Sequence, residues 1–147
     1  MHAIELLKAD HRKVEAYFEQ FKANDDGDNK ALYEKINAEL EVHTHIEETI
    51  FYPRLKEDGD DELKKIVFEG IEEHRQVKMF LRELGEMKSG DSDKFNAKLK
   101  VVVEDVTHHV QEEENEMFPK CEEQFDSSVL EEIGTEMQAE KAKFKTF

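Results

Sequence analysis

Two stretches of this sequence carry the same spacing of residues that are able to bind a metal ion. His43 stands four residues before Glu47, and His109 stands four residues before Glu113. Residues i and i+4 of a helix lie one above the other on the same face, so each pair directs an imidazole and a carboxylate to one point. Each stretch therefore predicts half of a metal site carried by a helix.

A proline follows each pair at the same distance. Pro53 and Pro119 each come six residues after the glutamate, and each directly follows an aromatic residue, Tyr52 or Phe118. Because proline cannot continue the hydrogen-bond ladder of a helix, we expect each helix to kink or to approach its end there.

A second motif is repeated as well. Residues 10–14 read DHRKV and residues 73–77 read EHRQV, so that His11 matches His74. Together with the two histidine–glutamate pairs, this repeat indicates an internal duplication. A duplicated pair of helices is expected to fold with approximate twofold symmetry, which places the two half-sites face to face.

The elements that must position these residues are helices, because apolar residues recur at steps of three and four and no segment alternates with period two. The four helices expected are about His2–Lys22, Asn29–Leu55, Glu62–Met87 and Asp93–Pro119. The predicted fold class is all-α, an antiparallel up-down four-helix bundle over residues 1–124 with internal twofold duplication. Residues 125–147 are expected to hold a tail helix, from about Ser127 to Phe144, that packs on the bundle or extends from it.

Six polar residues interrupt the apolar stripes of the four expected helices. They are His11, His43, Glu47, His74, His109 and Glu113. Burying an unpaired carboxylate costs several kcal/mol, and two close carboxylates also repel each other. A pair of metal ions satisfies all six groups at once, and imidazole and carboxylate ligands suit Fe, Mn or Zn. The alternative is a network of histidine–glutamate hydrogen bonds in the core without an ion.

Most other polar residues near these positions are predicted to lie on the surface. This prediction covers His2, His45, His108, Glu48, Glu112, Glu114 and Glu116. Cys121 is expected to be an ordinary thiol, and Tyr52 is expected to serve packing. Gly70 precedes His74 by one turn, where Leu7 precedes His11, and this difference predicts a small access path on one side.

Composition limits the possible partners. The 147 residues suit one domain, and the formal net charge of −16 disfavours nucleic acid and anionic membranes as partners. No apolar run approaches the ~18 residues of a membrane-spanning helix, and the N-terminus lacks the pattern of a signal peptide. A single cysteine excludes an internal disulfide and suits a reducing cytoplasm, so we expect a cytoplasmic protein.

The quoted residues resemble the hemerythrin family, specifically bacterial hemerythrin-like (HHE cation-binding) domains, over about residues 2–122. The motifs that carry the resemblance are Asp10-His11, His43 to Glu48 with Phe51-Tyr52-Pro53, Glu73-His74, and His109 to Glu114 with Phe118-Pro119. The resemblance implies a four-helix bundle with a non-haem di-iron centre. In it, His11 and His43 would bind one iron and His74 and His109 the other. Glu47 and Glu113 would bridge the irons together with an oxo or hydroxo group.

Two positions depart from the pattern of the family's oxygen carriers. Those carriers have a further histidine one turn after the third-helix ligand, where this chain has Lys78. They also end with His and Asp at i and i+5, whereas His109 and Glu113 are at i and i+4. The resemblance therefore implies two histidines per iron and open positions for O2, peroxide or NO, and it disfavours plain oxygen storage.

The leading hypothesis is a di-iron protein that binds or senses O2, a related small oxidant or NO. One alternative is a di-iron enzyme that acts on peroxide or O2 or oxidises Fe(II). Another is an iron storage or sensing protein whose acidic bundle is folded by the metal. A structural interaction module without metal is the remaining alternative. The sequence does not decide between enzyme and binding protein, and it leaves the oligomeric state open.

Overall fold

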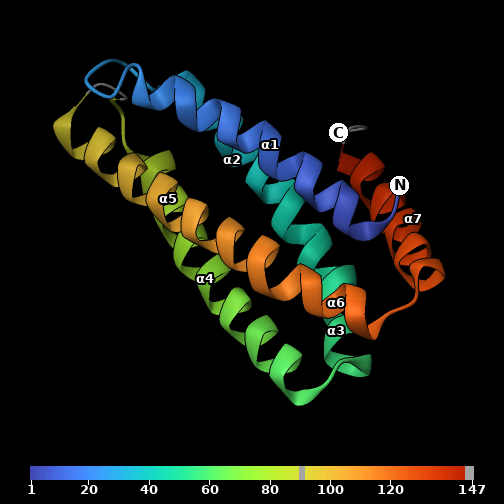
Figure 1. Cartoon of the computed structure of the whole chain (residues 1–147). Coiled ribbons are helices and arrows are strands. Elements are labelled where there is room, and N and C mark those ends of the chain that lie inside the picture. The colour runs from blue at the N-terminus through green and yellow to red at the C-terminus, as the bar shows by residue number, and fades with distance from the viewer. Residues whose placement is uncertain (90–91, 145–147) are drawn as a thin grey trace.

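The computed structural model describes residues 1–89 and 92–144, and every regular element within these ranges is a helix. The elements are α1 (Ala3–Lys22), α2 (Lys30–Ile46), η1 (Glu47–Phe51), α3 (Tyr52–Asp58), α4 (Asp61–Glu86), α5 (Asp93–Glu112), η2 (Glu113–Met117), α6 (Phe118–Gln124) and α7 (Ser127–Phe144). Within the described residues, α1, α2 to α3, α4 and α5 to α6 make four long runs, and α7 is a shorter tail helix. The long runs lie antiparallel to one another, as Figure 1 shows. The predicted all-α bundle with a tail helix is confirmed. Residues 90–91, between the third and fourth expected helices, and residues 145–147 of the expected tail lie outside the described residues.

Polar side chains cap the N-termini of three long helices, α1, α4 and α5. Ser92 accepts a hydrogen bond from Phe95 N at 3.0 Å, and Asp60 accepts one from Leu63 N at 2.9 Å. His2, which we predicted to lie on the surface, is only partly exposed and accepts a hydrogen bond from Ile4 N at 3.2 Å through Nδ1. Such caps satisfy amide groups that have no partner inside the helix.

The second and fourth runs contain a π-helical turn and continue past their prolines. Each π segment begins at a predicted ligand, Glu47 in η1 and Glu113 in η2. The amide of Tyr52 bonds to Glu47 O, five residues back, and the amide of Phe118 bonds to Glu113 O in the same way. The wider turn places the following proline at the start of a new α-helical register, where its missing N–H costs little. The runs therefore end at 58 and 124, later than expected.

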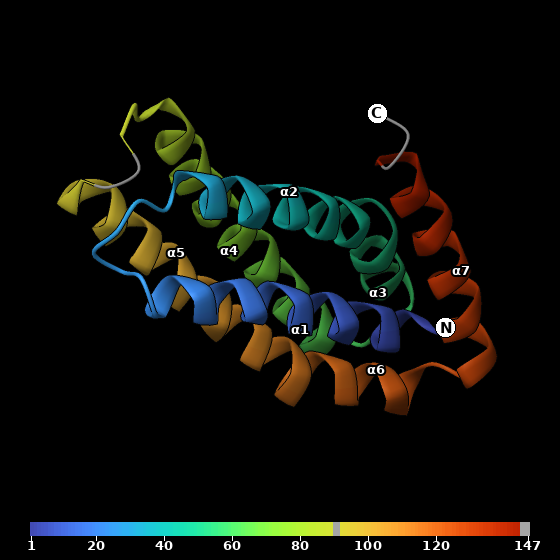
Figure 2. The same cartoon turned by 90° about the horizontal axis from the view of Figure 1, so that it is seen from above.

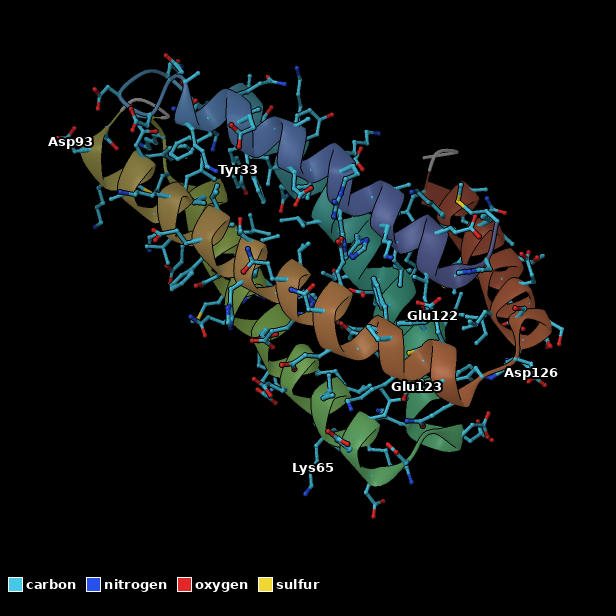
Figure 3. All side chains as sticks on the ribbon, in the orientation of Figure 1. Tyr33, Lys65, Asp93, Glu122, Glu123 and Asp126 are labelled. Carbon is cyan, nitrogen blue, oxygen red and sulfur yellow. The ribbon has the colours of Figure 1, made fainter. Side chains whose placement is uncertain are left out.

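The apolar core forms two clusters along the bundle. One cluster packs the starts of α1 and α4 against α3, α6 and α7, and includes Leu7, Tyr52 and Phe118. The other lies toward the opposite end of the bundle and includes Phe95 and Leu99 of α5. In Figure 3 the labelled side chain of Tyr33 lies among the helices, whereas Lys65 projects away from the bundle. The buried histidines and glutamates lie outside both clusters, which leaves a polar layer in the bundle interior.

The tail helix α7 lies at the end of the bundle where α1 begins, as Figure 2 shows. It buries Leu130, Ile133 and Met137 against the first apolar cluster. A Cβ at Gly134 would lie 2.8 Å from Ala3 N, so the absence of a side chain there permits the close approach of the two helices. Among residues 1–89 and 92–144, no helix is long and apolar enough to span a lipid bilayer.

Candidate metal centre

The structure brings the six residues predicted as ligands into one ring inside the bundle. In order around the ring they are His43, Glu47, His74, His109, Glu113 and His11. None of the six is more than 8% exposed. Each of the four long runs contributes to the ring, and the two runs with π turns contribute two residues each. The stripes and the duplication therefore place these residues together, as expected.

Glu47 is the part of the ring that lacks partners. Its Oε1 lies 3.1 Å from His74 Nε2 and 3.3 Å from His43 Nε2, but neither contact has the geometry of a hydrogen bond. Both oxygens of Glu47 and Nε2 of His43 are buried without a hydrogen-bond partner. Orphaned buried polar atoms are costly, so three such atoms around one point fit a site for a cation.

Glu113 occupies the equivalent place in the other half and has more partners. Its Oε1 lies 3.0 Å from His11 Nε2, and its Oε2 lies 3.4 Å from His109 Nε2. Tyr52 also donates a hydrogen bond to Oε2 at 2.6 Å. Each glutamate thus contacts one histidine of each predicted pair, which is the arrangement that a bridging carboxylate needs.

Tyr52 belongs to the centre rather than only to the core. Its hydroxyl oxygen lies 3.4 Å from Nε2 of both His74 and His109, and its ring stacks on His74 with centroids 5.4 Å apart. A Cβ on Gly70 would lie 3.2 Å from this hydroxyl oxygen. The space at Gly70 is therefore filled by Tyr52, and our expectation of an access path there is wrong.

An outer carboxylate holds the Nδ1 atom of each ring histidine. The pairs are His43–Asp10 at 3.0 Å, His109–Glu73 at 2.6 Å, His74–Glu48 at 2.7 Å and His11–Glu114 at 2.6 Å. When Nδ1–H donates to a carboxylate, Nε2 is left free to bind a metal, and this is the usual second partner of metal-binding histidines. The prediction that Glu48 and Glu114 lie on the surface is wrong, because each is only partly exposed and pairs with a buried ring histidine.

A repeated signal in the sequence marks these outer carboxylates. Asp10 and Glu73 directly precede His11 and His74, while Glu48 and Glu114 directly follow the two ring glutamates. Each of them reaches across to a histidine on a different helix, and not to its neighbour in sequence. Adjacency in both copies could have singled them out, but their partners depend on how the helices pack.

Basic side chains hold three of the four outer carboxylates. Lys78 lies 2.8 Å from Glu48, Arg12 contacts Glu114, and Lys141 of α7 contacts Asp10. Lys78, which stands where the family's oxygen carriers have a histidine, is 44% exposed and points to Glu48.

The fourth outer carboxylate, Glu73, has a different environment. It lies with Glu112 and His108 in a partly exposed group of possible donors. Burial raises the pKa of Glu112, and the neighbouring charge of Glu73 raises it further. His108 is 67% exposed in its side chain, as predicted for a surface residue.

Neighbouring charges shift the pKa values of two ring residues, His43 and Glu113. Burial lowers the pKa of His43, but the charge of Glu47 and the hydrogen bond to Asp10 raise it to about 10. Burial raises the pKa of Glu113, but the charge of His109 and hydrogen bonds bring it well below its ordinary value. These surroundings therefore favour an ionised Glu113 and a positively charged His43.

A small cavity opens beside the four histidines. It has a volume of about 30 Å³ and apolar walls that include Val14, Leu40, Val77, Val106 and Val110. A cavity needs about 10–15 Å³ to hold one water molecule, so this one has room for a ligand of about two or three heavy atoms.

Two other predictions concern residues outside the ring. His45 lies at the interface with α7, where its Nε2 is 2.9 Å from Glu140 Oε1 and its side chain is 35% exposed. Cys121 is buried, and burial raises the pKa of its thiol to about 12. A thiol with such a pKa is a poor nucleophile, as expected for an ordinary core cysteine.

The donor atoms fall into two groups that could each hold a metal ion. His11, His43 and Glu113 form one group, Glu47, His74 and His109 form the other, and the donor atoms within each group lie within 4.8 Å of one another. We call these the first and second half-site. Imidazole nitrogen and carboxylate oxygen suit Fe, Mn and Zn alike.

Known proteins share both the sequence pattern and the fold. The chain is 25% identical over 149 residues to a DNA nickase of Nostoc sp., with 99% of this chain and 40% of that protein covered. It is 29% identical over 114 residues to an uncharacterized hemerythrin-like protein of Schizosaccharomyces pombe, with 77% and 56% covered. The chain thus spans about half the length of these curated relatives, or less.

A solved structure has the same fold as this chain. It is the crystal structure of a hemerythrin HHE cation binding domain-containing protein from Mycobacterium kansasii, with a TM-score of 0.81. The two chains are 24% identical, and the match covers 99% of this chain and 88% of the other. The pattern of the hemerythrin HHE cation binding domain matches residues 2–121, most of the chain. This chain therefore belongs to the hemerythrin HHE cation-binding domain family.

Proposed function

We propose that the chain holds two iron ions, joined by a solvent-derived oxo or hydroxo bridge, and binds or senses O2, a related small oxidant or NO. The observation that carries this proposal is the pair of orphaned oxygens on Glu47 inside a ring of four histidines. Each histidine has its Nδ1 on a carboxylate, so its Nε2 is prepared for a metal.

The contacts support a proposed role for each ring residue. His11 and His43 would hold the ion of the first half-site, and His74 and His109 would hold the ion of the second. Glu47 and Glu113 would bridge the ions, because each lies between histidines of both half-sites. Bound iron supplies the redox chemistry and the open positions for a small ligand.

The cavity favours small ligands over larger ones. At about 30 Å³ and with valine and leucine among its walls, the cavity suits O2, NO or peroxide better than a larger organic substrate. Val106 of α5 lines the cavity, and its apolar side chain is not one of the predicted metal ligands. Replacing Val106 by Phe should fill the cavity and slow ligand binding while leaving the metal content unchanged.

The experiment is a measurement of metal content and the optical spectrum of aerobic protein, followed by rapid mixing with O2, NO and azide. Two irons per chain and an oxo-bridged absorption in the near ultraviolet are expected. A stable coloured adduct that forms more slowly in Val106→Phe supports a binding or sensing protein. Protein that takes up no iron, or binds these ligands equally fast in Val106→Phe, contradicts the proposal.

One observation favours a second function, an enzyme that acts on peroxide or O2. Tyr52 places a hydroxyl group 2.6 Å from Glu113 and 3.4 Å from two ring histidines, where it can exchange a proton with the ring carboxylate. Catalytic consumption of peroxide by the iron-loaded protein, lost in Tyr52→Phe, would favour the enzyme. A long-lived adduct without turnover would favour the sensor.

The nickase relative makes nucleic acid a question for experiment. Its match covers only 40% of that protein, and this chain carries a formal net charge of −16. We propose that this chain has no nucleic-acid partner, because phosphate backbones repel such a charge. A gel-shift assay with duplex DNA at low salt tests this, and a retarded band would refute it. The cytoplasm remains our proposed location, because the single cysteine is a free thiol.

A further inference from the structure

The tail helix α7 brings a charged side chain to the centre from outside residues 2–121, the part of the chain that matches the family. Gly134 packs against Ala3 at the start of α1. Seven residues later on both helices, which is about two turns, Lys141 contacts Asp10. The close approach at Gly134 therefore determines where Lys141 lies.

A second contact fixes the far end of α7. His45 of α2 pairs with Glu140 at 2.9 Å, and its ring packs edge-on against Phe144 with centroids 4.9 Å apart. His45 follows His43 by two residues on α2, so this contact joins α7 to the helix that carries one histidine of the first half-site. Lys141 is held between two anchors, one on α1 and one on α2.

Asp10 uses both of its oxygens. Its Oδ2 lies 3.0 Å from Nδ1 of His43, and its Oδ1 accepts from Lys141 Nζ. Asp10 is only 9% exposed, so it has little water to replace a lost partner. A buried carboxylate that loses its cation must move toward solvent or take up a proton, and either change weakens its hold on His43.

The equivalent contacts elsewhere stay within the bundle. Glu48 takes its cation from Lys78, which stands four residues after His74 on α4. Glu114 takes its cation from Arg12, which directly follows His11. Among these three outer carboxylates, Asp10 alone depends on the tail helix.

We propose that Lys141 is a positioning residue that holds Asp10 against His43, so that α7 sets the metal affinity of the first half-site. This inference rests on the proposed function, since it needs two metal ions in the ring. It gives the tail helix a role in the centre beyond the apolar contacts that it makes with the bundle.

The test is a titration of metal-free protein with Co²⁺, followed by absorption spectroscopy. The wild-type chain should bind two ions. Lys141→Met should weaken one of them by roughly 10- to 100-fold, as loss of an outer partner does, and leave the other unchanged. Lys141→Arg should restore most of the affinity. Lys78→Met should instead weaken the ion of the second half-site.

A matched control and a double variant separate positioning from a general loss of structure. Glu136→Gln removes an exposed charge from the same helix and should leave both affinities unchanged. Asp10→Asn should weaken the same ion as Lys141→Met. Because Lys141 acts through Asp10, the double variant should bind Co²⁺ no more weakly than Asp10→Asn alone.

Each outcome decides between the two ideas. Two ions bound with wild-type affinity by Lys141→Met would overturn the role of Lys141 and leave the proposed function intact. Equal weakening of both ions, additive effects in the double variant or no rescue by arginine would also overturn it. Wild-type protein that binds no Co²⁺ would overturn both. Circular dichroism of the metal-free variants verifies that they fold. If Lys141→Met does not fold, the Co²⁺ affinities of Asp10→Asn and Lys141→Arg still test the proposal.

Discussion

The residues before the two prolines, Tyr52 and Phe118, occupy equivalent places in the duplicated halves of this chain. Tyr52 stacks on His74, and Phe118 stacks on His11 with centroids 5.9 Å apart and planes only 8° from parallel. Only Tyr52 has a hydroxyl group, and that group donates to Glu113. Glu47, which stands five residues before Tyr52 in the same copy of the repeat, receives no such hydrogen bond and is the glutamate with two orphaned oxygens.

This comparison shows how a duplicated site becomes unequal. Gly70 and Tyr52 stand on one side where Leu7 and Phe118 stand on the other, so one side gains a hydroxyl and the space for it. The ring itself is repeated, while its surroundings differ. Unequal surroundings give two metal ions different electrostatics even with the same kinds of ligand.

Replacing the ring glutamates should have the largest effect. Glu47→Gln and Glu113→Gln should each lower the affinity for both ions by more than the roughly 10- to 100-fold expected for an outer partner. The two should differ in metal-free protein, because Glu113 accepts hydrogen bonds and Glu47 does not. Urea unfolding should show that Glu113→Gln is destabilised and Glu47→Gln is not.

The exposed Glu41 of α2 supplies the control for these variants. Glu41→Gln should change neither metal affinity nor unfolding. A Glu47→Gln protein that keeps either ion with full affinity would show that Glu47 does not bridge.

Removing the hydroxyl of Tyr52 should have the next largest effect. Tyr52→Phe removes the hydroxyl that donates to Oε2 of Glu113, and the metal-free protein should lose about 1–3 kcal/mol of unfolding free energy. The spectrum of the loaded protein should shift as well. Tyr33→Phe is the matched control, because Tyr33 donates to Leu81 O at 2.6 Å far from the ring. Tyr33→Phe should be less stable than the wild-type chain, but its metal spectrum should not change. A shifted metal spectrum in Tyr33→Phe would contradict a specific role for the Tyr52 hydroxyl.

The stability gained from metal should increase with pH. The pKa of His43 is about 10 in the folded metal-free chain, against 6.5 for an ordinary histidine. The stability from its proton is therefore complete below pH 6.5 and is lost as the pH rises through 10. Metal needs the unprotonated imidazole, so it replaces the proton more easily at higher pH. Thermal unfolding at pH 6, 7.5 and 9 should show a growing gap between loaded and chelated protein, whereas a constant gap would contradict this.

The smallest effect is expected at Gly70. A Cβ there would lie 3.2 Å from the Tyr52 hydroxyl oxygen and 3.5 Å from His109 Cε1. Gly70→Ala should therefore move Tyr52 by a few tenths of an ångström, a cost that the helix propensity of alanine, about 1 kcal/mol, offsets. We expect nearly unchanged unfolding with a small shift in the spectrum of the loaded protein. An unchanged spectrum would show that the position of the Tyr52 hydroxyl does not affect the bound ions.

Local patterns in the sequence determined the helices, the duplication and the six ring residues. Spacings of three and four residues place side chains on one face of a helix whatever the rest of the chain does. The His43–Glu47 and His109–Glu113 pairs therefore follow from the sequence alone. The expected ends of two helices were too early, because a π turn before Pro53 and Pro119 shifts the register, although the repeated spacing of glutamate and proline marks both turns.

Only the tertiary structure decided which partners surround the ring. The sequence shows Asp10 directly before His11. In the structure, however, Asp10 pairs with His43 on another helix and with Lys141 of α7. Such contacts join residues far apart in the chain, and their distances depend on how helices pack side by side. The periodicity of one helix therefore shows which residues face inward, while the packing of several helices determines what each of them contacts.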